Sequence, residues 1–204
     1  TRILLARPPE LGRDVLLVSG IEPSFRWRAF TVELMQYAQD AGVSAIYVLG
    51  ALMADVAHTR NIPVTATSED ERTLHRLDLE RSTYEGPTGI VGVVADAAHQ
   101  AGVTTVSLWA AVPHYAGHAP SPKATLALLQ RLSTVLGHPL PTADLVDEAA
   151  EWERGVNELA KTDDEVAEYV EALEEAQDTA DLPEASGDAI AREFERYLRQ
   201  QPDE

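Results

Sequence analysis

Short apolar runs alternate with helical patterns through the first two thirds of the chain. Strand-like runs occupy residues 15–18, 44–49, 64–67 and 104–110. Apolar residues at spacings of three and four predict helices over residues 30–41, 68–81, 90–101 and 121–136. Glycines 42, 102 and 137 follow three of these segments, at the position that ends many helices. The alternation predicts an α/β layered domain with a largely parallel sheet, which usually carries its ligands on the loops at the carboxyl ends of the strands.

The predicted helix starts rest on polar residues next to apolar patterns. Residues 68–71 and 162–165 have the spacing of a capping box, in which a hydroxyl and a carboxylate three positions later cap the first amides. Ser121 is a further N-cap candidate, with Pro122 at the first helical position, where its missing amide removes no hydrogen bond. After the run at 44–49, the pattern predicts a loop over residues 50–60.

The last third has a different pattern. It predicts helices at 143–159 and 162–177, a break at 182–187, and a helix at 189–199 with Ile190, Phe194, Tyr197 and Leu198 on one face. Residues 142–204 hold 21 acidic and 5 basic side chains, against 13 and 11 in residues 1–141. We therefore expect an α/β core at 1–141 and an acidic helical region at 142–204, whose charged face is most simply solvated surface.

The charge and composition also exclude classes of function. A net charge of −18 repels phosphate backbones and anionic lipid, so neither nucleic acid nor a membrane is an expected partner. The chain has no cysteine, which excludes disulfides, thiolate metal sites and cysteine nucleophiles. No apolar run reaches the length of a membrane span, and a cytoplasmic protein is expected. Because the chain starts at Thr1 and passes almost directly into a strand, we also expect an upstream piece.

Candidate chemistry gathers in three predicted loops, at residues 50–60, 84–89 and 112–123. If their strands end at one edge of the sheet, the loops meet there. Histidines in two of the loops could act as acid or base, and cations and helix-start amides could hold an anion. The acid-base candidates are His58 and His114, and the anion-binding candidates are Arg60, Thr88, Gly89, Ser121 and Lys123.

Each candidate also has a structural interpretation. A loop histidine such as His58 is more often a hydrogen-bonding residue than a catalyst. Lys123, in the first turn of a predicted helix, opposes the helix dipole and needs a carboxylate or a bound anion beside it. Trp27 and Phe30 are expected as core or interface anchors. Glycine-rich phosphate loops, nucleophile elbows and metal-binding histidine pairs do not occur in the sequence, which therefore predicts neither metal nor cofactor.

Several segments together resemble the actinobacterial branch of the proteasome assembly chaperone family, second-subunit type. The matching residues are 20–23 with Trp27 and Phe30, 49–51, 58–64, 86–90, 107–115, 121–125, 152–153 and 182–187. The resemblance implies a three-layer α/β/α sandwich around a mixed sheet, like that of purine nucleoside phosphorylases and related hydrolases, with a further strand and helix upstream. It also implies a homo-oligomer, with a trimer as the first expectation.

Two hypotheses of function follow. The first is a non-enzymatic assembly factor that contacts partner proteins, proteasome subunits among them, through its loops and its acidic helical region. The second is a small-molecule enzyme or sensor that holds an anion at the strand-end loops, with His58 or His114 as acid or base. The second depends on those side chains meeting in space and rests largely on analogy of fold.

Overall fold

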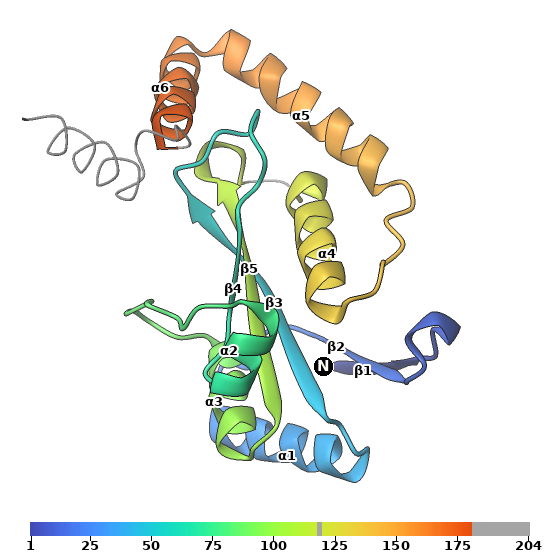
Figure 1. Cartoon of the computed structure of the whole chain (residues 1–204). Helices are drawn as coiled ribbons and strands as arrows, with labels where there is room; N and C mark the ends of the chain where they lie inside the picture. The colour runs from blue at the N-terminus through green and yellow to red at the C-terminus, as the bar shows by residue number, and fades with distance from the viewer. Residues whose placement is uncertain (118–119, 181–204) are drawn as a thin grey trace, which may run out of the picture. The chain divides into compact units, whose positions relative to one another are not determined.

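The computed structural model describes residues 1–117 and 120–180 (Figure 1). The predicted break at 182–187 and helix at 189–199 lie outside the described residues. The strands are β1 (Arg2–Ala6), β2 (Val15–Ser19), β3 (Ala45–Ala54), β4 (Val64–Thr67) and β5 (Thr104–Pro113). The helices are α1 (Trp27–Asp40), α2 (Glu71–Leu77), α3 (Ile90–Gln100), α4 (Pro122–Leu136), α5 (Leu145–Thr162) and α6 (Asp164–Ala180), with short 3-10 turns η1 (Pro9–Leu11) and η2 (His114–Ala116).

The chain forms two compact units. The first comprises Thr1–Ala51, Val64–Ala110 and Ala127–Thr142. The second comprises Leu52–Pro63, Ala111–Leu126 and Ala143–Glu204. Residues 118, 119 and 181–204 of the second unit are outside the described part of the chain. The second unit thus combines residues from both sides of position 141, and a domain boundary at 141 stays a prediction.

A three-stranded sheet in the order β3-β5-β4 and a separate β1–β2 hairpin make up the β-structure of the described residues. β4 is antiparallel to β5, with Val64 opposite Ala110 and Thr67 opposite Ser107. β3 and β5 run in the same direction (Figure 1), so the sheet is mixed. The α/β class is confirmed, and the arrangement is consistent with the expected three-layer sandwich.

The core of the first unit lies between β4, β5 and two helices. Val106 and Leu108 alternate on one face of β5, and they cluster with Ala66 of β4 and Val135 of α4. Leucines of α2 and α4 pack around this cluster, at positions 74, 77, 128 and 132. Burial of this apolar surface is the main force that holds these elements on the sheet.

The structure corrects the predicted end of the strand near Gly50. β3 continues through Gly50 to Ala54, so the predicted loop at 50–60 shortens to residues 55–60. A Cβ atom at position 50 would lie only 2.5 Å from the indole ring of Trp109. Gly50 therefore allows close approach of the tryptophan to the strand, where the pattern indicated a turn.

The two predicted capping boxes are also corrected. The cap of α2 is Asp70, whose carboxylate accepts from the amide of Thr73 at 3.1 Å, while the hydroxyl of Ser68 donates to the carbonyl of Thr105. α2 ends at Leu77 rather than near residue 81. At α6 the carboxylate of Asp163 accepts from the amides of residues 165 and 166, so it takes the role predicted for Thr162. An aspartate at the right place competes well with a hydroxyl because its oxygen carries charge.

Within the described residues, the structure contains no helix long and apolar enough to cross a membrane.

Candidate functional site

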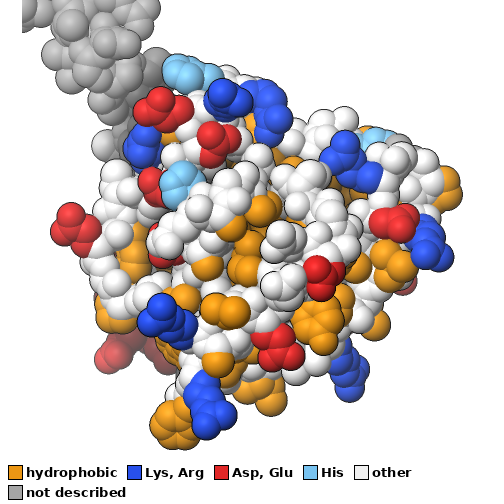
Figure 2. All heavy atoms as spheres, turned by 90° about the horizontal axis from the view of Figure 1, so that it is seen from below, with side chains coloured by type: hydrophobic (Ala, Val, Ile, Leu, Met, Phe, Trp, Pro, Cys, Tyr) orange, Lys and Arg blue, Asp and Glu red, His pale blue; other side chains and the backbone are white. Residues whose placement is uncertain are grey.

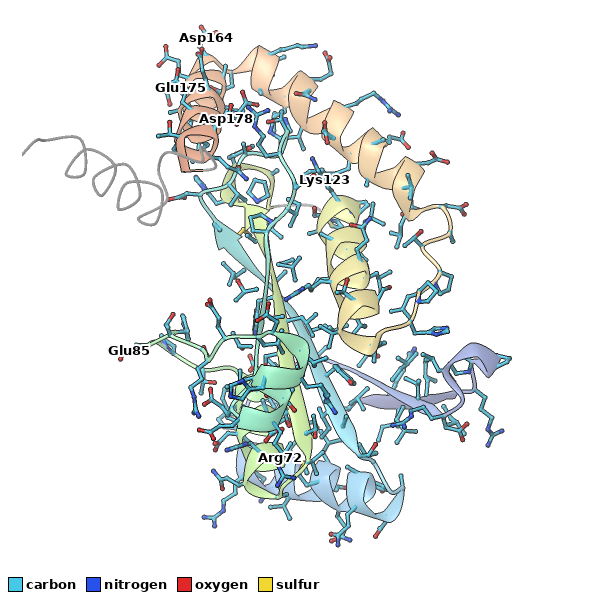
Figure 3. The ribbon with its side chains drawn as sticks, viewed as in Figure 1. Arg72, Glu85, Lys123, Asp164, Glu175 and Asp178 are labelled. Carbon is cyan, nitrogen blue, oxygen red and sulfur yellow. The ribbon has the colours of Figure 1, made fainter. Side chains whose placement is uncertain are left out.

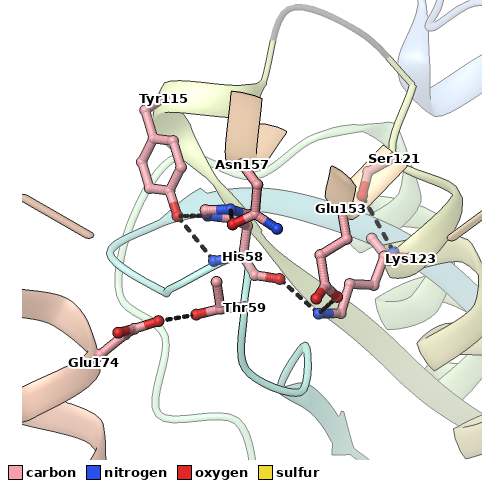
Figure 4. Close-up of polar contacts among 9 residues, drawn as sticks. His58, Thr59, Tyr115, Ser121, Lys123, Glu153, Asn157 and Glu174 are labelled. Carbon is pink, nitrogen blue, oxygen red and sulfur yellow. Dashed lines mark hydrogen bonds and ion pairs between the residues drawn. The ribbon is translucent and has the colours of Figure 1, made fainter. Parts of the chain in front are cut away.

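A network of polar side chains surrounds the loop that follows β3 in the second unit (Figure 4). We call it the His58 cluster. Its members are His58, Thr59, Tyr115, Lys123, Glu153, Asn157 and Glu174. Four segments distant in sequence supply partners to residues 58 and 59: η2, the start of α4, α5 and α6. The cluster therefore holds one loop in place by contacts from helices as much as 115 residues away.

His58 is fully buried, and both of its ring nitrogens have partners. Nδ1 lies 2.9 Å from the hydroxyl of Tyr115, and Nε2 lies 3.2 Å from the amide oxygen of Asn157. The Asn157 oxygen only accepts, so Nε2 carries the proton and Nδ1 accepts from the tyrosine hydroxyl. Burial lowers the pKa of His58 below its ordinary value, although the hydrogen bond to Asn157 acts in the opposite direction. The imidazole is thus a neutral, saturated hydrogen-bonding group.

Tyr115 binds the backbone of the same loop. Its hydroxyl accepts from the amide of His58 at 2.8 Å, and the two rings meet edge to face with centroids 5.6 Å apart. Burial raises the pKa of the Tyr115 phenol above its ordinary value. The hydroxyl stays protonated and can donate to the imidazole.

Lys123 joins the loop to α5. Its ammonium donates to the carboxylate of Glu153 and to the backbone carbonyl of His58, each at 2.5 Å. The lysine side chain is only 16% exposed and that of Glu153 is 36% exposed. The unfavourable place of this cation in the first turn of α4 is therefore compensated by a carboxylate of the chain itself. Ser121 caps α4 as predicted, since its hydroxyl accepts from the amide of Ala124 at 3.2 Å.

α6 contacts the same loop through two acidic side chains. Thr59 donates a hydrogen bond to Glu174, and the guanidinium of Arg60 lies 2.7 Å from the carboxylate of Asp178. Both acidic residues lie near the C-terminal end of the helix, and Figure 3 labels Asp178 there. Arg60 is thus neutralised by a carboxylate of the second unit.

His114 lies in a second group, made of aromatic rings around an exposed carboxylate. Its Nδ1 is 3.4 Å from Asp55, and its ring meets those of Tyr115 and Tyr169 edge to face, with centroids 5.9 and 5.2 Å apart. The hydroxyl of Tyr169 donates to Asp55 at 3.0 Å. Burial of the phenol, together with the adjacent carboxylate of Asp55, raises the pKa of Tyr169.

The predicted candidates are thus divided between the units. The two histidines, Arg60, Ser121 and Lys123 belong to the second unit, so two of the three loops do supply one local network. Thr88 and Gly89 belong to the first unit, where the carboxylate of Glu22 accepts from the first amide of α3, at Ile90, at 2.6 Å. The anion at that helix start is a side chain of the chain itself.

The two aromatic interface candidates belong to the first unit. Trp27 opens α1 and donates its indole N–H to the carbonyl of Pro23. Trp27 and Phe30 are both partly buried. Their role at an interface stays a proposal.

Sequence reasoning missed the partners on α5 and α6. Glu153 and Asn157 are four residues apart, so they share one face of α5, and the same spacing could have indicated a pair directed at one target. Asn157 contacts His58, 99 residues earlier, and Glu153 contacts Lys123, 30 residues earlier, and no local pattern reveals either partner.

The described residues show little that is typical of a catalytic centre. No group of three or more histidine, aspartate or glutamate side chains among them could hold a metal ion. An open hollow of about 420 Å³ lies in the first unit and is lined by residues 71, 74, 75, 78, 79 and 81 of α2 and the segment after it, none of which is a sequence candidate. Each cation near the loop, Arg60 or Lys123, is paired with a carboxylate.

Comparison with known proteins places the chain in a family. Residues 1–160 match the model of the PAC2 family. A PAC2 family protein of Streptomyces avermitilis is 47% identical, with a TM-score of 0.73, and the match covers 82% of this chain and 70% of the other. A proteasome-assembly chaperone homologue of Mycobacterium tuberculosis is 46% identical, with a TM-score of 0.74 and coverage of 83% and 72%.

More distant structures share the fold alone. An archaeal proteasome activator of Pyrococcus furiosus is 17% identical, with a TM-score of 0.63 and coverage of 77% of this chain and 70% of the other. No curated protein matches the chain. The match of the family model over residues 1–160 and the two relatives above 45% identity lead to one conclusion: this chain belongs to the PAC2 family.

Proposed function

We propose that this chain is a cytoplasmic, non-enzymatic assembly factor that forms a homo-oligomer and binds proteasome subunits. The observation that carries the proposal is its 46% identity to the proteasome-assembly chaperone homologue of Mycobacterium tuberculosis over 83% of its length.

The geometry of the His58 cluster supports binding rather than chemistry. A catalytic acid or base needs a free position toward a substrate, whereas His58 uses both ring nitrogens within the protein. An anion site needs free cations, whereas Lys123 and Arg60 each have a carboxylate partner. These contacts hold α5 and α6 to the backbone of residues 58–60 and so fix the acidic helices within the second unit.

The acidic helices offer the matching surface for a basic partner. The described residues 143–180 carry 14 acidic and 2 basic side chains. Several of the carboxylates are exposed on α6, Asp164 and Glu175 among them (Figure 3). Such a surface attracts basic proteins and speeds their association.

Affinity capture from the native cells tests the proposal. The tagged full chain is expected to recover proteasome subunits, quantified by mass spectrometry. A triple variant, Glu165→Lys with Glu168→Lys and Glu171→Lys, reverses the charge of exposed positions on α6. Its recovery should fall by about tenfold or more, because charge reversal replaces attraction with repulsion.

The matched control reverses the same number of exposed carboxylates in the first unit, at Glu33, Glu80 and Glu85. Its recovery should change by less than about twofold. Equal losses in the two triples would show that total charge alone matters and that α6 is not the contact. If the unaltered chain recovers no proteasome subunit, the proposed function is wrong.

A further inference from the structure

One carboxylate beside the His58 cluster has neither a lysine nor an arginine as a partner among the described residues. Glu153 pairs with Lys123 and Asp178 pairs with Arg60. The side chain of Asp55, in contrast, is 78% exposed, and its nearest basic group is the imidazole of His114 at 3.4 Å. An imidazole carries charge only when it is protonated. Asp55 therefore lacks a permanent cation.

The surroundings of this carboxylate are already ordered by the chain. The rings of His114, Tyr115 and Tyr169 meet edge to face in all three pairings, with centroids 5.2 to 6.0 Å apart. Such packing fixes the orientation of aromatic rings. The hydroxyl of Tyr169 donates to Oδ1 of Asp55 at 3.0 Å, and His114 also lies next to Oδ1.

The second carboxylate oxygen is available to a ligand. Oδ2 of Asp55 has no hydrogen-bond partner within the part of the chain that the structure describes. A ligand can therefore bind there without displacing the contacts of Oδ1. We call Asp55, His114 and Tyr169 the Asp55 site; all three belong to the second unit.

The chemistry of the Asp55 site favours a guanidinium. This group is planar and permanently charged, donates to carboxylates and lies well against aromatic rings. An ammonium is a compact, strongly hydrated charge and gains less from the rings. An apolar occupant would leave the carboxylate without a partner, and an anion would be repelled by it.

The charge of the neighbouring helices adds to this preference. The described residues 143–180 carry 14 acidic and 2 basic side chains, and they include Tyr169. Figure 2 shows a face of the molecule on which side chains of both charges lie between hydrophobic ones. An excess of one charge, as in residues 143–180, raises the local concentration of cations.

We propose that the Asp55 site binds an arginine side chain of a partner protein. The inference rests on the proposed function, which supplies the partner, and it names the chemistry that recognises one of the partner's side chains. Arginine is among the residues that contribute most to binding at protein interfaces. A site whose rings and carboxylate are held in place before binding loses little side-chain entropy when the ligand arrives.

A titration of the isotope-labelled full chain with the amide of acetyl-arginine, followed by NMR, tests the site without the partner. The ring signals of His114 and Tyr169 should shift in a saturable way, with a dissociation constant in the millimolar range. Acetyl-citrulline amide has the same size without the charge and should cause no saturable shift. Acetyl-lysine amide should bind at least about threefold more weakly than the arginine compound.

Asp55→Asn keeps the shape of the side chain and removes its charge. It should weaken binding of the arginine compound by about fivefold or more. The matched control is Glu175→Gln, at an exposed carboxylate of α6, and it should change binding by less than about twofold. Equal losses in the two variants, or equal binding of the citrulline or lysine compound by the unaltered chain, would overturn the proposal. The comparison of the three compounds needs no variant, so it remains decisive if Asp55→Asn folds poorly.

The chain itself is the alternative source of the guanidinium, because residues 181–204 contain Arg192, Arg196 and Arg199. Replacement of all three by glutamine should change the affinity for the arginine compound by less than about twofold. A gain of about fivefold or more would show that these arginines occupy the site, and it would rule out the partner as its ligand.

Capture of proteasome subunits separates this inference from the proposed function. Asp55→Asn should lower their recovery by about fivefold, and unchanged recovery would show that the partner's arginine does not bind at Asp55. If the unaltered chain recovers no proteasome subunit, the proposed function fails, whereas the NMR titration still shows whether the site selects a guanidinium.

Discussion

Replacement of Lys123 tests whether the ion pair with Glu153 holds the loop at residues 58–60 to α5. Lys123→Met keeps the length of the side chain and removes the ammonium. The change leaves the carboxylate of Glu153 and the carbonyl of His58 without their donor. Both groups lose their contact with a cation that is 16% exposed.

The expected size of the effect follows from burial. Breaking a fully buried pair by removing one partner costs about 3–5 kcal/mol, because the remaining charge is uncompensated. Glu153 still has a 36% exposed side chain, so water compensates part of that loss. We therefore expect the free energy of opening of α5 to fall by about 2–3 kcal/mol, which corresponds to amide exchange about 30 to 150 times faster.

Hydrogen exchange followed by mass spectrometry on α5 peptides measures this change within the second unit. Lys161 is the matched control, because it is the only other lysine of the chain and its pair with Glu158 is largely exposed. Lys161→Met should change the exchange rate by less than about threefold.

A double-mutant cycle of Lys123→Met with Glu153→Leu isolates the energy of the pair itself. The coupling energy should be about 1–3 kcal/mol, because the double variant leaves no unpaired charge. A coupling energy near zero, or equal effects at Lys123 and Lys161, would refute the reasoning that burial makes the Lys123–Glu153 pair more stabilising than an exposed pair.

Two further predictions concern a buried histidine and two glycines. The lowered pKa of His58 means that the unfolded chain binds more protons near and below pH 6.5, so the free energy of unfolding should fall as the pH drops from about 7.5 to 5.5. His58→Gln should weaken that pH dependence in urea titrations, and an unchanged slope would contradict the neutral imidazole. Gly50→Ala should destabilise the protein by about 1–3 kcal/mol, because its Cβ meets the ring of Trp109. Gly155→Ala, in α5 with no atom within 4 Å of the added Cβ, should stabilise by about 0.5–1 kcal/mol. Equal melting temperatures of the two glycine variants would show that the close approach does not matter.

Element types were predictable wherever local chemistry decides them. The β-type run at β4, the α4 cap at Ser121 and the helix ends before Gly42, Gly102 and Gly137 occur where the patterns predict them. These glycines have positive φ angles of 66°, 74° and 66°, a conformation that a residue with a side chain rarely adopts. Such preferences act over a few residues and need no tertiary context.

The errors have a common cause. Gly50 is typical of a strand end by itself, and only the position of Trp109 on β5 explains why it lies inside β3. At the starts of α2 and α6, several polar residues in a row can cap, and the backbone path selects aspartate in both cases. Local propensity offers alternatives there, and packing selects one of them.

By itself, the sequence determined the α/β class, the acidic character of the last third and the family. The class follows from the alternation of strand and helix patterns, the acidity from the residue counts, and the family from the segments that resemble its members, and each of these can be observed in the sequence alone. Only the tertiary structure decided the state of the candidate side chains. It gives His58, Arg60 and Lys123 partners on α5 and α6, between 30 and 118 residues away in sequence. The reason is physical: a side chain's charge and hydrogen-bonding capacity are local properties, whereas their satisfaction depends on groups that only folding brings within about 3 Å.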